Sequence, residues 1–179
     1  MKQIIESNIK SIIENSKDAL FFHNARNEEL KGVNNFPLVT TIVESSGINN
    51  YEGIENKAIK LYDVEMMIIE PFPKTKQFIQ VGGKGVPESD LSFALRMSER
   101  REEMTGILEQ IIYYLTDESY PFKYTMFSNI QFNNVYFEDL PLNVFGKTAI
   151  FTLQKNFKKQ FCCVDFNEDA IKLISPNKC

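Results

Sequence analysis

Histidine, cysteine and tryptophan are scarce in this chain of 179 residues, which has one histidine, three cysteines and no tryptophan. The chain also lacks any uncharged apolar run of about 18 residues. Its strongest apolar run, 64–72, is interrupted by Glu65, Glu70 and Pro71. We therefore expect no membrane-spanning helix. The amphipathic first residues include Glu6 and Glu14, which is not typical of a secretory signal, so we expect the chain to stay in the compartment where it is made.

The few cysteines do not indicate a disulfide framework or a metal site. Cys162 and Cys163 are adjacent and would point to opposite faces of a strand, and Cys179 is the last residue. A reduced cytoplasm is the simplest setting for them. A nucleophile and base pair of Cys162 or Cys163 with His23 is conceivable, but small strand residues and a histidine at a strand edge are the plainer interpretation. We predict no catalytic residue, no metal and no other cofactor.

Basic residues are fewer than acidic residues, with 20 Lys and Arg against 24 Asp and Glu. The formal net charge is −4 and the isoelectric point is about 5.2, which argues against a general nucleic-acid coat or a membrane-surface protein. The main basic cluster is Lys155, Lys158 and Lys159, with Phe157 and Phe161 between them. This pattern fits either a strand that contacts nucleic acid or a charged edge strand that prevents unwanted pairing.

Glycine is also infrequent, with eight in the chain, but three of them fall in the octet VGGKGVPE at 81–88. A phosphate-binding loop needs a Ser or Thr directly after its lysine, whereas Lys84 is followed by Gly85. Pro87 also removes an amide donor. We therefore exclude a nucleotide site and predict a flexible or extended loop. Gly82, Gly83, Lys84 and Gly85 are our candidates for an assembly loop or a loop that faces a central channel.

The hydrophobic pattern predicts one α+β domain over 1–179: an antiparallel sheet, an N-terminal helix and a long helix packed across the sheet. Ser89 is the expected N-cap of the long helix. Connections are expected at 24–35, 74–89 and 138–146, and a mobile tail at 167–179. The expected elements are a helix at 2–16, strands at 20–22, 36–44 and 56–73, a helix at 90–119, and then a β-meander with strands at 122–132, 134–138, 147–157 and 160–166.

The sequence SERREE at 98–103 forms the charged middle of the long predicted helix. Its simplest interpretation is a solvated or bent turn in which Arg100 pairs with Glu103 and Glu99 opposes Glu103. The alternative is a polar contact with a neighbouring subunit, for which Glu99, Arg100, Arg101 and Glu102 are the candidates.

Three stretches in this order resemble a known family: NNFPLVTTIVE after the first helix, REEMTGILEQIIYYL in the long helix, and LPLNVFGKTAIFTLQKNFKKQFCC at the end. The chain is similar to the small ring-forming neck proteins of tailed bacteriophages, of the head-tail joining and tail-terminator type. Its last stretch looks like versions found in phages of Bacteroidetes, crAss-like ones included. The resemblance rests on the order and length of elements over 1–166.

The resemblance implies a structural virion protein, made in the host cytoplasm and placed in the neck of the phage. Copies of the chain would form a six- or twelve-fold ring between portal, adaptor or tail proteins, and genomic DNA would pass through without sequence-specific binding. The family has no catalytic residues. Two other classes stay open: a small intracellular protein-binding adaptor that forms no ring, and an enzyme with Cys162 or Cys163 as nucleophile and His23 as base.

Overall fold

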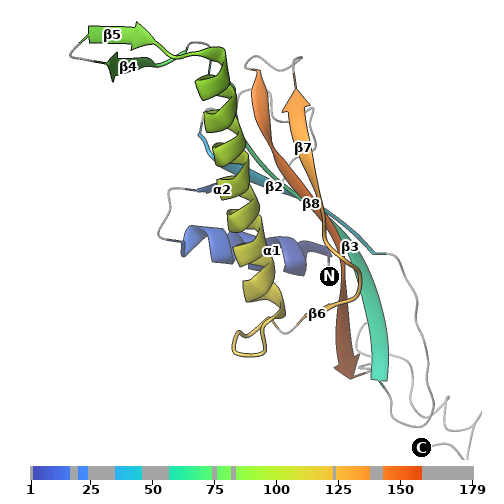
Figure 1. Ribbon diagram of the computed structural model, residues 1–179. Coiled ribbons are helices and arrows are strands. Elements are labelled where there is room, and N and C mark those ends of the chain that lie inside the picture. The colour runs from blue at the N-terminus through green and yellow to red at the C-terminus, as the bar shows by residue number, and fades with distance from the viewer. Residues whose placement is uncertain are drawn as a thin grey trace, which may run out of the picture.

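Two long antiparallel strands, β3 (Lys57–Pro71) and β8 (Val144–Lys158), pair along all of their 15 residues and form the centre of the sheet (Figure 1). At roughly 3.3 Å per residue each strand is about 50 Å long. The computed structural model describes residues 2–16, 20–23, 35–45, 57–73, 76–81, 84–122, 124–137 and 143–158. Three predicted segments lie outside these ranges: the connection at 24–35 except for its last residue, the strand 160–166 and the tail 167–179.

The other strands extend the sheet on both sides of this pair. β2 (Leu38–Ser45) is antiparallel to β3, and β1 (Phe21–Phe22) is parallel to β2. On the far side, β7 (Gln131–Phe137) and β6 (Thr125–Met126) both run antiparallel to β8. The predicted α+β class with a mostly antiparallel sheet is therefore confirmed.

The predicted β-meander after the long helix is wrong in one respect. β7 pairs with residues 144–150 of β8, and β6 pairs with residues 153 and 154. The two strands therefore follow one another along the same edge of β8 instead of pairing with each other. Within the expected strand 122–132, only the two residues of β6 and the first two residues of β7 are in strands. β8 begins at Val144, inside the expected connection 138–146.

Both helices cover the same face of the sheet (Figure 1). α1 (Lys2–Glu14) buries Ile5, Ile9 and Ile13, whose spacing of four places them on one side of the helix. α2 (Asp90–Thr116) buries six residues on its sheet-facing side: Met97, Met104, Leu108, Ile111, Ile112 and Leu115. Among the described residues no helix is long and apolar enough to cross a membrane. The two helices and the sheet thus enclose one main core.

The start of α2 and the alternation along β8 agree with the sequence. Ser89 is the N-cap of α2, and its side-chain oxygen accepts a hydrogen bond from the Ser92 amide at 3.1 Å. In β8, Phe151 and Leu153 are buried beneath the helices, whereas Ile150, which precedes them, is exposed on the other face. β8 thus alternates between the face that the helices cover and an exposed face.

The predicted connection 74–89 is wrong over much of its length. Two strands in this stretch, β4 (Phe78–Val81) and β5 (Lys84–Pro87), form a separate two-stranded antiparallel sheet. This hairpin projects from the start of α2, at the opposite end from the crossing of α1 and α2 (Figure 1). It is the only described element that lies outside the main sheet and its two covering helices.

Candidate functional site

The β4–β5 hairpin contains the described part of the predicted assembly loop. Lys84 and Gly85 lie in β5, and both are exposed. Gly82 and Gly83 stand between the two strands in the sequence and lie outside the described residues. A Cβ atom added at Gly85 would lie 3.8 Å from Phe78 Cδ1, an ordinary contact. Packing therefore does not require glycine at this position.

A buried carboxylate fixes the base of the hairpin to α2. Glu88 directly follows β5 and is 4% exposed. Its carboxylate accepts hydrogen bonds from Arg96 Nε at 3.0 Å and Arg96 Nη2 at 2.8 Å, and from the Gln77 amide at 3.2 Å. The Glu88 amide in turn donates to the Gln77 carbonyl at 2.8 Å. One side chain thus joins both strands of the hairpin to the second turn of α2.

The electrostatics of this junction favour the ionised form of Glu88. The hydrogen bonds from Arg96 lower the pKa of Glu88, and the Gln77 amide lowers it further, while burial acts in the opposite direction. The Arg96 guanidinium also lies 5.2 Å from the centre of the Phe93 ring. Lys76 pairs with Asp90 at the surface nearby. The hairpin is therefore held in a defined position by charge as well as by backbone bonds.

Apolar side chains are exposed on the hairpin and on the first turns of α2. Phe78 is 73% exposed and Leu91 is 71% exposed. Val86 in β5 and Leu95 in α2 are also exposed. Leu91 and Leu95 are four residues apart and so share one face of the helix. Several exposed apolar side chains on a projecting hairpin and on the helix turns to which it is attached are typical of a protein–protein contact.

The charged turn of α2 is divided between the sheet and the solvent. Arg100 donates to the Glu70 carboxylate of β3 through Nε at 2.9 Å and Nη2 at 2.8 Å. Arg101 is half-buried, with its guanidinium 5.9 Å from the centre of the Phe145 ring. Glu99 and Glu102 are exposed. Two of the four candidates for a subunit contact thus bind the chain's own sheet, and the two glutamates remain available at the surface.

Sequence reasoning missed the ion pair between Glu70 and Arg100, because the two residues are 30 apart in the chain. It did anticipate the local pair of Arg100 with Glu103. A better signal existed for the hairpin. FIQV and KGVP are two short segments separated by Gly-Gly, a pattern typical of a two-residue hairpin turn.

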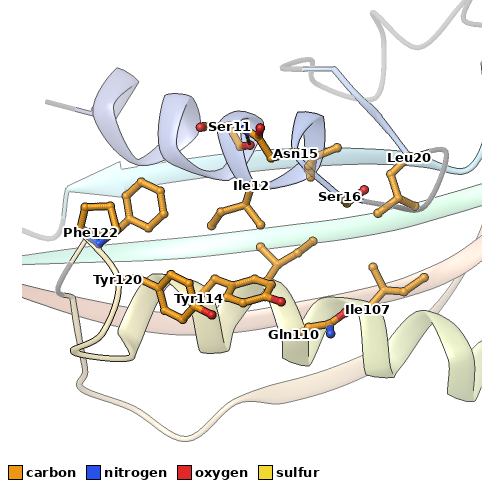
Figure 2. Close-up of a pocket in the computed structure, with 13 residues that line it drawn as sticks. Ser11, Ile12, Asn15, Ser16, Leu20, Ile107, Gln110, Tyr114, Tyr120 and Phe122 are labelled. Carbon is orange, nitrogen blue, oxygen red and sulfur yellow. Dashed lines mark hydrogen bonds between the residues drawn. The ribbon is translucent and has the colours of Figure 1, made fainter.

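A groove of about 710 Å³ lies between α1 and the C-terminal half of α2. Figure 2 shows Ile12 of α1 facing Ile107 and Tyr114 of α2 across it. Tyr120 packs on Tyr114 with ring centres 4.8 Å apart, and Phe122 closes one end. Polar atoms of Ser11, Asn15, Ser16 and Gln110 line the rim. The groove is large enough for a small ligand or for side chains of a partner.

The described residues bring together no group of three or more His, Cys, Asp or Glu side chains that could hold a metal ion. His23 follows β1, and its amide donates to the Val39 carbonyl at 3.0 Å. The cysteines lie outside the described ranges, so the structure does not test the alternative in which Cys162 or Cys163 pairs with His23. Of the basic cluster, Lys155 is described on β8, where its Nζ lies 4.6 Å from the centre of the Tyr124 ring.

Comparison with known proteins gives no family assignment. No protein-family model matches the chain, and no curated protein matches it either. Function is therefore inferred from the projecting hairpin, the groove between the helices and the order of elements.

Proposed function

We propose that the protein is a structural virion protein, a subunit of a ring in the neck of a tailed bacteriophage, as head-tail connector or tail terminator. In this role it works by binding identical neighbours, and portal, adaptor or tail proteins above and below it. DNA passes through the ring without sequence-specific contacts. The subunit performs no chemistry of its own.

The order of elements supports this proposal. An N-terminal helix is followed by antiparallel strands, a long helix across the sheet and closing strands. This is the order for which the chain resembles the neck proteins. The resemblance rests on the order and length of these elements, and the projecting β4–β5 hairpin is a further feature of this chain.

The observation that carries the proposal is the hairpin fixed by Glu88. A small element that projects into solvent gains little stability by itself, since an isolated two-stranded hairpin is marginal in water. Here it is joined to α2 by a buried ion pair and still exposes Phe78. A rigid projection with exposed apolar groups fits a subunit that contacts its neighbours better than it fits an isolated monomer.

Native mass spectrometry of the full chain over a concentration series tests the proposal. A discrete hexamer or dodecamer is the expected result, and electron microscopy of the same sample should show closed rings. A dimer or a monomer at every concentration would contradict ring formation.

The groove favours one second candidate, a small intracellular adaptor that binds another protein without forming a ring. Its apolar walls and polar rim suit a peptide segment as well as a neighbouring subunit. A monomer at every concentration, together with saturable binding of a heterologous peptide in the groove, would favour this adaptor.

A further inference from the structure

We infer that the β4–β5 hairpin of one copy docks in the groove between α1 and α2 of the next copy. The inference rests on the proposed function and specifies the contact through which the ring would close. The donor surface is the hairpin with Phe78, and the acceptor is the groove lined by Ile12, Ile107 and Tyr114.

The two surfaces lie at opposite ends of a continuous helix, so a chain cannot fill its own groove. The hairpin is attached at Asp90, and Gln110 on the rim of the groove follows 20 residues later. At 1.5 Å per residue this separation is about 30 Å along α2. The Glu88 junction also holds the hairpin against the first turns of the helix. The hairpin can therefore reach only the groove of another molecule.

The hairpin and the groove are both apolar at the surfaces that would meet. Phe78 is the most exposed large apolar side chain of the described residues, at 73%. The groove presents isoleucine and aromatic side chains from both helices (Figure 2). Aromatic residues pack well against such walls, with ring edges meeting ring faces. Docking would remove from water apolar surface on both sides.

Charge complementarity favours the same pairing. Lys76 and Lys84 are the only charged residues in the described hairpin segments 76–81 and 84–87, and Lys76 is paired with Asp90. Both α1 and α2 direct their C-terminal halves to the groove, and neither has a basic residue in its last turn. Helix C-termini carry partial negative charge. The acceptor therefore suits the exposed ammonium group of Lys84.

Two acidic residues also stand where α2 ends. Asp117 follows the last residue of α2, and Glu118 beside it is exposed. Hydrogen bonds from Ser119 lower the pKa of Asp117, so this carboxylate is ionised at neutral pH. A hairpin that carries Lys84 and a groove at the C-terminal halves of two helices attract each other, whereas two hairpins or two grooves would not.

A contact between two different surfaces of the same chain is heterologous. Such contacts generate a closed ring when the rotation between copies divides a full turn, and an open filament when it does not. The pairing of hairpin and groove therefore supplies the kind of interface that a ring requires, without a two-fold axis between neighbours.

Photo-crosslinking of the full chain tests this contact. Benzoylphenylalanine is placed at position 78, and an equal mixture of nitrogen-15-labelled and unlabelled chains separates crosslinks between copies from those within a copy. We expect intermolecular crosslinks to peptides that contain residues 11–16 or 107–122. The control is benzoylphenylalanine in place of Phe127, which is 60% exposed and lies between β6 and β7. This control should give no crosslinks to those peptides.

A Ser11→Trp variant blocks the groove from an exposed position and should abolish the crosslinks from position 78 without changing the melting temperature. Persistence of the crosslinks in this variant would overturn the inference. A hexamer or dodecamer with crosslinks elsewhere would overturn it and leave the ring proposal standing. Groove crosslinks within open filaments would support the inference and contradict the ring. No intermolecular crosslinks at all would overturn the inference.

Discussion

Gly146 in β8 lies directly against the backbone of Ile68 in β3, so closely that a Cβ atom at Gly146 would come within 2.0 Å of the Ile68 carbonyl oxygen. The close approach occurs in the middle of the sheet, because Gly146 pairs with Ile69 on one side and Val135 on the other. Gly146→Ala therefore forces the backbones of the two central strands apart. We expect a loss of about 3 kcal/mol or more in the free energy of unfolding, measured by urea denaturation.

Gly106→Ala is the matched control for this substitution. Gly106 is exposed within α2, and a Cβ atom there would meet nothing within 4 Å. Alanine favours the helix over glycine by roughly 1 kcal/mol, so this variant should be more stable than the parent. Equal effects of the two alanines would show that the close approach at Ile68 is relieved at little cost.

The pKa of Glu88 predicts how the hairpin junction depends on pH. Arg96 lowers the pKa of Glu88 while the hairpin is attached to α2 of the same chain. Detachment of the hairpin from α2 raises this pKa toward its ordinary value. The stabilisation is therefore fully present above the ordinary glutamate pKa and is lost as pH falls through the lowered value. Carbon-13 NMR of the Glu88 side-chain carboxyl should show it titrating below the ordinary glutamate pKa.

Glu88→Gln should release the hairpin at neutral pH. Glutamine keeps the shape of the side chain but replaces the charged carboxylate, whose two oxygens accept hydrogen bonds from Arg96. The backbone amide of residue 88 donates a hydrogen bond to the Gln77 carbonyl, and its hydrogen exchange at pH 7 should become faster in this variant. Glu99→Gln, at an exposed position, serves as control. Unchanged exchange in both variants would mean that the backbone bonds hold the hairpin without the charge.

Local patterns predicted the parts of the fold that depend on neighbours in sequence. The hydrophobic pattern of residues 2–16 predicted α1, and Ser89 predicted the start of α2, because helix periodicity and capping act over a few residues. The position of β6 and β7 along one edge of β8 was not predictable in the same way, because it depends on pairing between distant strands.

The candidate site was predicted less well, for two physical reasons. The glycines and the lysine of the octet at 81–88 occur in loops of several kinds, and the two strands that flank Gly82 and Gly83 are too short to show a clear alternation. The groove is formed by α1 and α2 together, which begin 88 residues apart in the chain. The periodicity of a helix shows which of its faces is apolar, but it does not show which distant helix packs beside it.

The pair of Glu70 and Arg100 should connect α2 to the sheet more strongly than the pair of Arg100 and Glu103 supports the helix. The Arg100–Glu70 contact is partly buried, with side-chain exposures of 31% and 18%, whereas Glu103 is 62% exposed. Double-mutant cycles with Arg100→Met should give a coupling of about 1 kcal/mol for Glu70→Gln. For Glu103→Gln the coupling should be about 0.4 kcal/mol. Equal couplings would contradict a role for burial.

Tyr124 allows a test in which the size of the effect changes with pH. Its hydroxyl accepts a hydrogen bond from Asn8 Nδ2 at 3.2 Å, and its side chain is buried between α1 and β8 residues of the main core. At neutral pH Tyr124→Phe should lower the free energy of unfolding by about 1 kcal/mol, because Asn8 loses its partner.

Burial raises the pKa of Tyr124 above its ordinary value of 10.0, because the phenolate is poorly solvated in the core. A folded-state pKa above the unfolded value gives a stabilisation that is complete below pH 10 and decreases as pH rises toward the folded value. The phenylalanine variant lacks this proton, so the stability difference between the two proteins should shrink above pH 10. Urea denaturation of both proteins at pH 7 and at pH 10.5 measures the two differences, in which the titration of the other tyrosines and the lysines cancels. A difference that stays constant between these pH values would mean that Tyr124 ionises as readily in the core as in the unfolded chain.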